Sequence, residues 1–192
     1  MARNKAFDPE ERLEKARDLF WERGYHATSM QDLVEAMQLN RASIYDTYGD
    51  KHALFLQCLG NYATDKREEY KAAAAGALSS IDAVEAIIRK ALERTLQEGK
   101  ACMVVKSSFE LAETDKEVNS ILKNDGDRLN DILEVLLMKA QSAGEISKDR
   151  DVKMLASYII ANFSGLWQTY IISKNEKLVT QMAEFLIQVI RQ

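Results

Sequence analysis

Apolar residues recur at three- and four-residue spacing along most of the chain, and few helix-breaking residues interrupt them. The 192 residues include one proline and eight glycines. Sheet proteins of this length usually contain more of both residue types, because their many turns require them. The pattern therefore predicts an all-α fold, which we divide into about nine helices.

The overall composition is typical of a folded globular protein, with 46% hydrophobic and 29% charged residues. The formal net charge is −4, so any contact with nucleic acid must come from a local group of donors. Two cysteines and two histidines argue against a disulfide scaffold and against a structural zinc cluster. We expect neither a metal site nor a bound cofactor.

Nothing in the sequence indicates export or insertion into a membrane. The first fifteen residues lack the apolar core of a signal peptide. The most apolar stretch, residues 154–167, is interrupted by polar side chains and is shorter than the roughly 20 residues that a membrane span needs. We therefore expect a cytoplasmic protein.

Capping residues predict where several helices begin. Thr28 with Gln31 forms a capping-box pattern before the second helix, where Ser29 is the other candidate. Thr114 with Glu117 forms a second such pattern before a long helix. Other expected caps are Asn40, Ser79, Asp149 and Asn175.

Two short helices joined by the tight connection Gln38-Leu39 are typical of a helix-turn-helix unit. In the second of them Ile44 is expected to point inward with Leu39 and Tyr48. The residues expected to face outward are Arg41, Ser43, Tyr45 and Thr47. A guanidinium group can read guanine, and hydroxyl groups can bind phosphates or base edges. From spacing alone, a small exposed helix without DNA contact is the alternative.

A resemblance to a known family favours DNA binding. The stretch from Gly24 to Met30 (GYHATSM), the pair Asp32-Leu33 and the stretch from Leu39 to Leu54 (LNRASIYDTYGDKHAL) closely resemble the N-terminal domain of TetR-family transcriptional regulators. The match covers roughly residues 10–56. It implies a DNA-binding domain over residues 1–52 and a helical ligand-binding and dimerisation domain over residues 53–192. It also implies a dimer that usually represses and that leaves a palindromic operator when an effector binds.

The resemblance also implies which residues meet DNA. These are Thr28, Ser29, Arg41, Ala42, Ser43, Tyr45, Thr47, Tyr48 and Lys51. Among them Arg41, Ser43 and Thr47 would read bases, whereas Thr28, Tyr45, Tyr48 and Lys51 would position phosphates or support the fold. Two departures stand out: Gln38 replaces the usual glycine of the turn, and Thr47-Tyr48 replaces a common His-Phe pair, which leaves the base preference open.

A second likeness concerns Cys102. Residues 99–106 (GKACMVVK) are similar to the Gly-Cys-Leu segment of a subgroup that includes the N-ethylmaleimide-reductase repressor, although Ala101 stands in place of the glycine. In that relative the matching cysteine is linked to sensing electrophiles and oxidants. A helix N-terminus with Lys100 and Lys106 nearby would favour the thiolate. The alternative is a small buried hydrophobic residue.

The last two helices are apolar on two faces, so both faces must be buried. On the first of them one stripe contains Val152, Leu155, Ile159, Phe163, Leu166 and Tyr170, and another contains Met154, Tyr158, Ala161, Gly165 and Ile172. Two such helices from each of two subunits would form a four-helix interface. The alternative is a monomer that covers these faces itself.

Methionine and aromatic side chains suit an adaptable apolar cavity for a small-molecule effector. The candidates are Tyr62, Cys102, Met103, Phe109, Leu133, Met138, Phe163 and Trp167, any of which could instead be core. The alternative function is an all-α enzyme or carrier with an N-terminal bundle that does not bind DNA. No pair of carboxylates at helical spacing on an apolar face supports catalysis.

Overall fold

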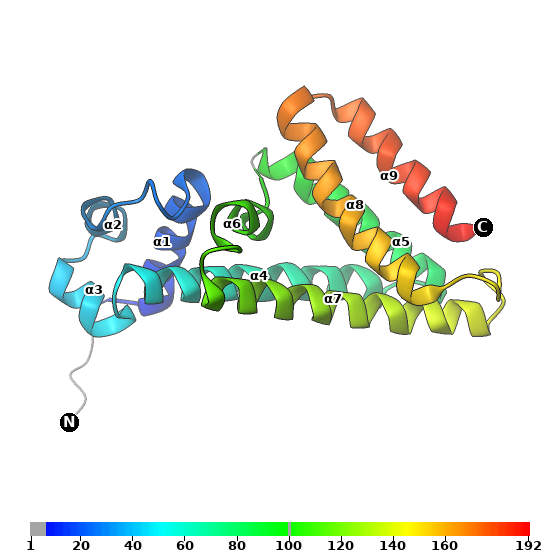
Figure 1. The fold of residues 1–192 in the computed structure, drawn as a ribbon, viewed down its shortest axis with the longest axis horizontal. Coiled ribbons are helices and arrows are strands. Elements are labelled where there is room, and N and C mark those ends of the chain that lie inside the picture. Colours follow the sequence, from blue (N-terminus) through cyan, green and yellow to red (C-terminus); the bar gives the residue numbers. More distant parts are fainter. Residues whose placement is uncertain (1–6, 100) are drawn as a thin grey trace. The chain divides into compact units, whose positions relative to one another are not determined.

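The computed structural model describes residues 7–99 and 101–192 (Figure 1). Within these ranges the chain forms nine helices and no strand, as predicted. The helices are α1 (Pro9–Arg23), α2 (Met30–Met37), α3 (Arg41–Tyr48), α4 (Lys51–Ala75), α5 (Ser80–Glu98), α6 (Met103–Leu111), α7 (Lys116–Ser142), α8 (Val152–Ser173) and α9 (Glu176–Arg191). None of the described helices is both long and apolar enough to cross a membrane.

The chain divides into two compact units, each of which is built from two separate segments of the sequence. Unit 1 contains residues 1–63 and 103–122, and unit 2 contains residues 64–102 and 123–192. Unit 1 therefore combines α1 to α3 and the start of α4 with α6 and the first turns of α7. The functional domain boundary after residue 52 is not tested by this division and stays a prediction.

Most of the helices begin at side-chain caps. Asn40, Ser79 and Asn175 accept hydrogen bonds from the first turns of α3, α5 and α9, as predicted. Of the two candidates for α2, Ser29 caps this helix with Asp32 as its capping-box partner, so the predicted Thr28–Gln31 capping box is wrong. Thr28 cannot take this role since its side chain is buried, and its hydroxyl donates to the carbonyl of Gly24 at 2.7 Å.

Two further caps lie one and two residues beyond the predicted positions. Asp115, not Thr114, caps α7, and its Oδ1 accepts hydrogen bonds from the next two free N–H groups, both at 3.0 Å. Asp151, not Asp149, caps α8 in the same way. In both places a carboxylate directly precedes the helix, where the free N–H groups and the helix dipole favour a negative charge.

The core of unit 1 is small and partly aromatic. The ring of Phe20 meets the ring of Phe55 edge-to-face with 5.1 Å between centroids, and Tyr25 packs against Phe55 at 5.0 Å. Aliphatic side chains of the three short helices complete it, among them Leu33, Met37 and Ile44, all fully buried.

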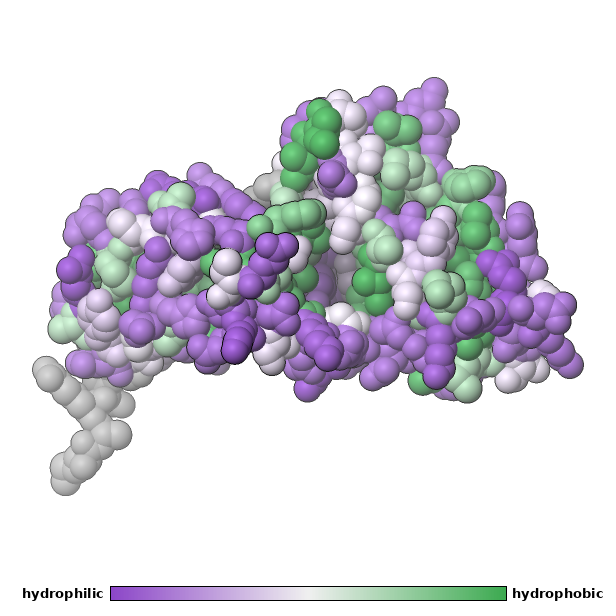
Figure 2. Space-filling model, in the orientation of Figure 1, coloured by the Kyte–Doolittle hydropathy of each residue, from purple (hydrophilic) through white to green (hydrophobic). Residues whose placement is uncertain are grey.

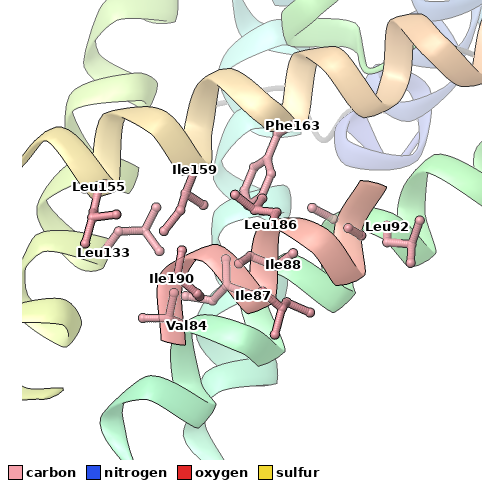
Figure 3. Close-up of a cluster of buried hydrophobic side chains, with 14 of the residues drawn as sticks. Val84, Ile87, Ile88, Leu92, Leu133, Leu155, Ile159, Phe163, Leu186 and Ile190 are labelled. Carbon is pink, nitrogen blue, oxygen red and sulfur yellow. The ribbon is translucent and has the colours of Figure 1, made fainter. Parts of the chain in front are cut away.

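The core of unit 2 is a continuous apolar cluster between long helices (Figure 3). In that view α5 contributes Val84, Ile87, Ile88 and Leu92, α7 contributes Leu133, α8 contributes Leu155, Ile159 and Phe163, and α9 contributes Leu186 and Ile190. The α8 stripe predicted from Val152 to Tyr170 therefore faces this core. Polar contacts lie around it, such as the buried carboxylate of Asp125, which binds both Lys66 and Arg67.

Candidate nucleic-acid interface

The turn between α2 and α3 is closed without a glycine. Gln38 ends α2 in the left-handed conformation, with φ 53° and ψ 41°. Its backbone N–H donates to the carbonyl of Glu35, and its side-chain oxygen accepts a hydrogen bond from Arg12 at 3.3 Å. The departure from the family pattern is thus accommodated by a non-glycine residue in a conformation that costs energy for most L-residues.

Helix α3 is anchored on one side and open on the other. Ile44 is fully buried, and the hydroxyl of buried Tyr48 donates to the carbonyl of Pro9 at 2.7 Å. Asn40 Oδ1 accepts the N–H of Ser43 at 2.8 Å and fixes the first turn. The contacts hold this helix against α1 and leave its N-terminal edge free.

The structure places the predicted DNA contacts in different environments. Arg41, Ala42 and Tyr45 are exposed on α3, whereas Ser43 and Thr47 are half-buried beside them. Ser29 is exposed but used as the α2 cap. Thr28 and Tyr48 are buried with their hydroxyl groups bound to backbone carbonyls. This arrangement favours the supporting role for Thr28 and Tyr48.

Lys51 is the first residue of α4, and its ammonium lies over the ring of Tyr25, 4.3 Å from the centroid. Such a cation–π contact holds the cation in place without neutralising it. Burial lowers the pKa of Lys51, and the nearby carboxylate of Glu110 opposes this shift. Lys51 therefore has a defined position at the start of α4.

The contacts of three polar residues of unit 1 were not predicted from the sequence. Glu110 and Lys106 of α6 bind the backbone at the end of α1 and in the loop that follows it. Asp115 Oδ2 lies 2.6 Å from Nε2 of His52 on α4. One signal was available: Lys106 and Glu110 are the only charged residues within α6 and are four positions apart. That spacing places both side chains on one face of the helix, but it does not predict which segment of the chain they contact.

The predicted effector residues are divided between the two units. In unit 1, Tyr62 and Met103 are buried, whereas Phe109 is 83% exposed on α6. In unit 2, Cys102, Phe163 and Trp167 are buried, Leu133 belongs to the core and Met138 is exposed. No finding tests these residues as an effector site, so all of them stay predictions.

The surroundings of Cys102 match the expected ones only in part. The residue directly precedes α6 and is buried, as a small hydrophobic residue would be. The ammonium of Lys106 donates to the carbonyl oxygens of Trp21 and Glu22 at 3.1 and 2.7 Å. Lys100 lies outside the described residues. The role of Cys102 as a sensor stays a prediction.

Two family models match the chain. Residues 13–58 match the model of bacterial regulatory proteins of the tetR family, and residues 77–186 match the tetracyclin repressor-like C-terminal domain. The second match covers more than half of the 192 residues. Both helical parts of the molecule are thus accounted for by one family.

Individual relatives agree with these matches. The chain is 33% identical over 174 residues to YezE, an HTH-type transcriptional regulator of Bacillus subtilis (strain 168), covering 89% of each chain. It is 28% identical to the HTH-type transcriptional repressor ComR of Escherichia coli (strain K12), covering 85% of this chain and 80% of ComR.

The fold is also found among solved structures. A cysteine mutant of the TetR family transcriptional regulator CifR, complexed with 26-base-pair double-strand operator DNA, superposes with a TM-score of 0.85 at 23% identity. The superposition covers 97% of this chain and 98% of that chain. The chain belongs to the TetR family and is a helix-turn-helix transcriptional regulator rather than an enzyme.

Proposed function

We propose that this regulator is a dimeric repressor that inserts α3 of each subunit into the major groove of a palindromic operator. The observation that carries the proposal is the exposed N-terminal edge of α3, where Arg41, Ala42 and Tyr45 are accessible while Ile44 and Tyr48 fix the opposite side. A helix held in this way can present its first residues to base edges. The relative ComR is named a repressor, and the CifR mutant was complexed with operator DNA.

Arg41 and Lys51 have different roles in this proposal. Arg41 is exposed at the start of α3 and would read a base through two hydrogen bonds. Lys51, held over Tyr25, would bind a phosphate and so contribute to every sequence equally. The free N–H groups at the start of α3 and α4 would add partial positive charge towards the backbone of DNA.

The second copy would pack against α8 and α9. The second predicted stripe of α8 lies on its outer side, with Met154 66%, Tyr158 43% and Ile172 77% exposed. On α9 Phe185 is 63% exposed. Figure 2 shows hydrophobic residues in green over this part of unit 2. A large exposed apolar surface is typical of a protein interface, and a four-helix contact would cover it.

The small residues in the middle of the stripe support a close contact between helices. Ala161 is exposed, and a Cβ added at Gly165 would meet no atom within 4 Å. A dimer with two-fold symmetry that reads a palindrome meets half-sites about one DNA turn, roughly 34 Å, apart.

The effector would bind in unit 2, near the buried aromatic side chains of α4 and α8. The ring of buried Tyr70 lies 5.9 Å from the ring of Phe163, and Trp167 is buried one turn further along α8. Aromatic walls with few polar groups suit a small, mainly apolar molecule. Mass spectrometry of the native protein tests this by detecting a co-purified ligand, and Cys102→Ser tests whether electrophiles act through the thiol.

The experiment that tests the proposal uses duplexes selected with the wild-type protein from a randomised library. Arg41→Ala should weaken binding to the selected duplex by about 10- to 100-fold and relax the preference at one position, as loss of a bidentate base contact does. Lys51→Ala should weaken binding to all sequences and reduce the salt slope by about one unit.

Arg128→Ala is the matched control, because Arg128 is exposed on α7 and its Nε donates to Asn124 of the same helix. It removes the same charge from unit 2 and should leave binding unchanged. Wild-type affinity and specificity in Arg41→Ala would contradict the proposed readout. An unchanged salt slope in Lys51→Ala would contradict the phosphate contact.

A further inference from the structure

One carboxylate of α6 binds two consecutive amides of the loop between α1 and α2. Oε2 of Glu110 accepts the backbone N–H of Tyr25 at 3.1 Å, and Oε1 accepts the N–H of His26 at 2.7 Å. These amides follow the end of α1 and have no partner within a helix. Charged acceptors form stronger hydrogen bonds than neutral ones, so this fork restrains the loop at two adjacent points.

The local sequence allows this close approach. Gly24 has φ 90°, and a Cβ at this position would lie 2.7 Å from Oε2 of Glu110. Any larger residue would therefore displace the carboxylate as well as strain the backbone. Glycine at position 24 therefore allows both the positive φ with which the chain leaves α1 and the close approach of Glu110 from α6.

Lys106, one turn before Glu110, completes the attachment. Its ammonium donates to the carbonyl oxygens of Trp21 and Glu22, the last turn of α1. The cation thus meets the negative end of α1, and the anion meets the free N–H groups that follow it. The positive charge of Lys106 thus meets carbonyl groups before Gly24, and the negative charge of Glu110 meets N–H groups after it.

The restrained loop lies directly beside the proposed DNA-binding residues. Tyr25 carries the ring that supports the ammonium of Lys51 at 4.3 Å. The carbonyl of Gly24 accepts the hydroxyl of Thr28 at 2.7 Å, and Thr28 precedes the Ser29 cap of α2. A shift of the loop would move both the support of Lys51 and the start of α2.

We propose that Glu110 is a positioning residue for DNA binding: it fixes the loop at Tyr25 and His26, and thereby the position of Lys51 and of α2. Glu110 acts through these residues and need not touch DNA itself. The inference rests on the proposed DNA contact of Lys51.

Electrostatics alone predicts the opposite result from positioning, which makes the inference testable. The carboxylate of Glu110 lies close enough to Lys51 to influence its pKa. Removing a negative charge near a phosphate-binding lysine should strengthen binding to DNA if charge were all that mattered. If Glu110 positions the loop, its neutralisation should weaken binding despite the more favourable charge.

The test compares Glu110→Gln with the wild-type protein and with Glu113→Gln. Glu113 is an exposed residue just after α6, so its substitution makes the same charge change in the same segment. Glutamine keeps the shape of the side chain but offers only one acceptor oxygen to the two amides. Affinity for the duplex selected with the wild-type protein, its salt slope, the helix content and the hydrogen exchange of the peptide covering residues 22–28 are measured.

The expected result for Glu110→Gln is affinity about tenfold lower than wild type, with normal helix content and exchange at Tyr25 and His26 about tenfold faster. Glu113→Gln should bind as tightly as the wild type or more tightly. Wild-type or stronger binding by Glu110→Gln would overturn the inference. If the glutamine variant does not fold, Glu110→Asp takes its place: reduced affinity in a folded protein supports positioning, and wild-type affinity overturns it.

The outcomes also separate this inference from the proposed function. If Arg41→Ala and Lys51→Ala bind DNA as the wild type does, the proposed DNA surface is wrong, whatever Glu110 does. If those variants lose affinity and Glu110→Gln does not, the surface holds and only the positioning role is wrong.

Discussion

The two compact units of this regulator are stabilised by different kinds of contact. Unit 2 has long helices around a continuous apolar cluster, with ion pairs such as Arg191 with Asp82 and Glu85 at its margin. Unit 1 has short helices and a small core, and many of its connections are side chains bound to backbone groups, as for Tyr48, Thr28 and Glu110.

The difference corresponds to what the proposed function requires of each unit. A DNA-reading surface needs a backbone fixed to fractions of an ångström, and directional hydrogen bonds provide this where the apolar core is small. A dimerisation surface needs apolar area, and unit 2 continues its apolar character onto the outer side of α8 and α9. The following predictions test this comparison, beginning with the largest expected effect.

Replacing Phe185 by aspartate should abolish the dimer. Phe185 is 63% exposed on α9, so the proposed contact would bury it and a buried unpaired charge there costs several kcal/mol. Sedimentation should give a mass of twice 21.8 kDa for the wild-type dimer and of 21.8 kDa for the monomeric variant. Leu78→Asp is the control, because Leu78 is 99% exposed in the turn before α5, outside the stripe. A dimeric Phe185→Asp protein would place the interface elsewhere.

Truncating the core of unit 2 should lower the free energy of unfolding strongly. Leu133 is fully buried among α5, α8 and α9, so Leu133→Ala loses apolar contacts and leaves a cavity, costing about 3 kcal/mol. Val135→Ala, on the exposed side of the same helix, should cost less than about 0.5 kcal/mol. Denaturant titrations measure both. Equal effects would mean that α7 does not use this face for its core.

Sequence reasoning succeeded where the information is local. The periodicity of α8 divided its apolar residues into two stripes, of which the first lies in the core and the second on the outer side of the helix. Asn40 and Asn175 marked the starts of α3 and α9 correctly. The errors at Thr28, Thr114 and Asp149 are of one or two residues, because neighbouring polar residues compete for the same cap. The roles of the predicted DNA and effector residues stay predictions.

The α6 attachment could not be derived from the sequence. Glu110 binds residues 84 and 85 positions away in the chain, and Lys106 likewise binds at separations of 84 and 85. No local pattern encodes such pairs, because only the folded chain brings them together. The sequence analysis included α6 in the predicted effector domain, and its contacts within unit 1 were therefore not expected.

Acid should weaken the attachment of α7 in unit 1. The N–H of Val118 and the side chain of His52 hold the pKa of Asp115 below its ordinary value. Asp115 therefore stabilises the fold above the unfolded pKa of about 3.9, and this contribution is lost as the pH falls through the lower folded pKa. The difference between wild type and Asp115→Asn should be about 1 kcal/mol at pH ~5, and it should shrink below pH ~4.

Thermal melting at a series of pH values measures this difference. Asp149→Asn is the control, since Asp149 is exposed and does not cap a helix. A difference for Asp115 that persists unchanged at the lowest pH would show that its carboxylate charge is not the stabilising feature.

The smallest effect is expected where a non-glycine residue adopts the left-handed conformation, which occurs once among the described residues of each unit. Gln38 and Lys174 are the two described non-glycine residues with positive φ, 53° and 51°. Glycine relieves the left-handed strain but adds freedom to the unfolded chain, and at position 38 it also removes the exposed hydrogen bond from Arg12. Gln38→Gly should therefore stabilise by only about 0.5 kcal/mol. Lys174→Gly should gain less, because the ammonium of Lys174 lies 5.3 Å from the centre of the Tyr170 ring and donates to Gly99. Melting temperatures of the two variants measure this difference. A larger gain for Lys174→Gly than for Gln38→Gly would show that the contacts of Lys174 with Tyr170 and Gly99 do not stabilise the fold.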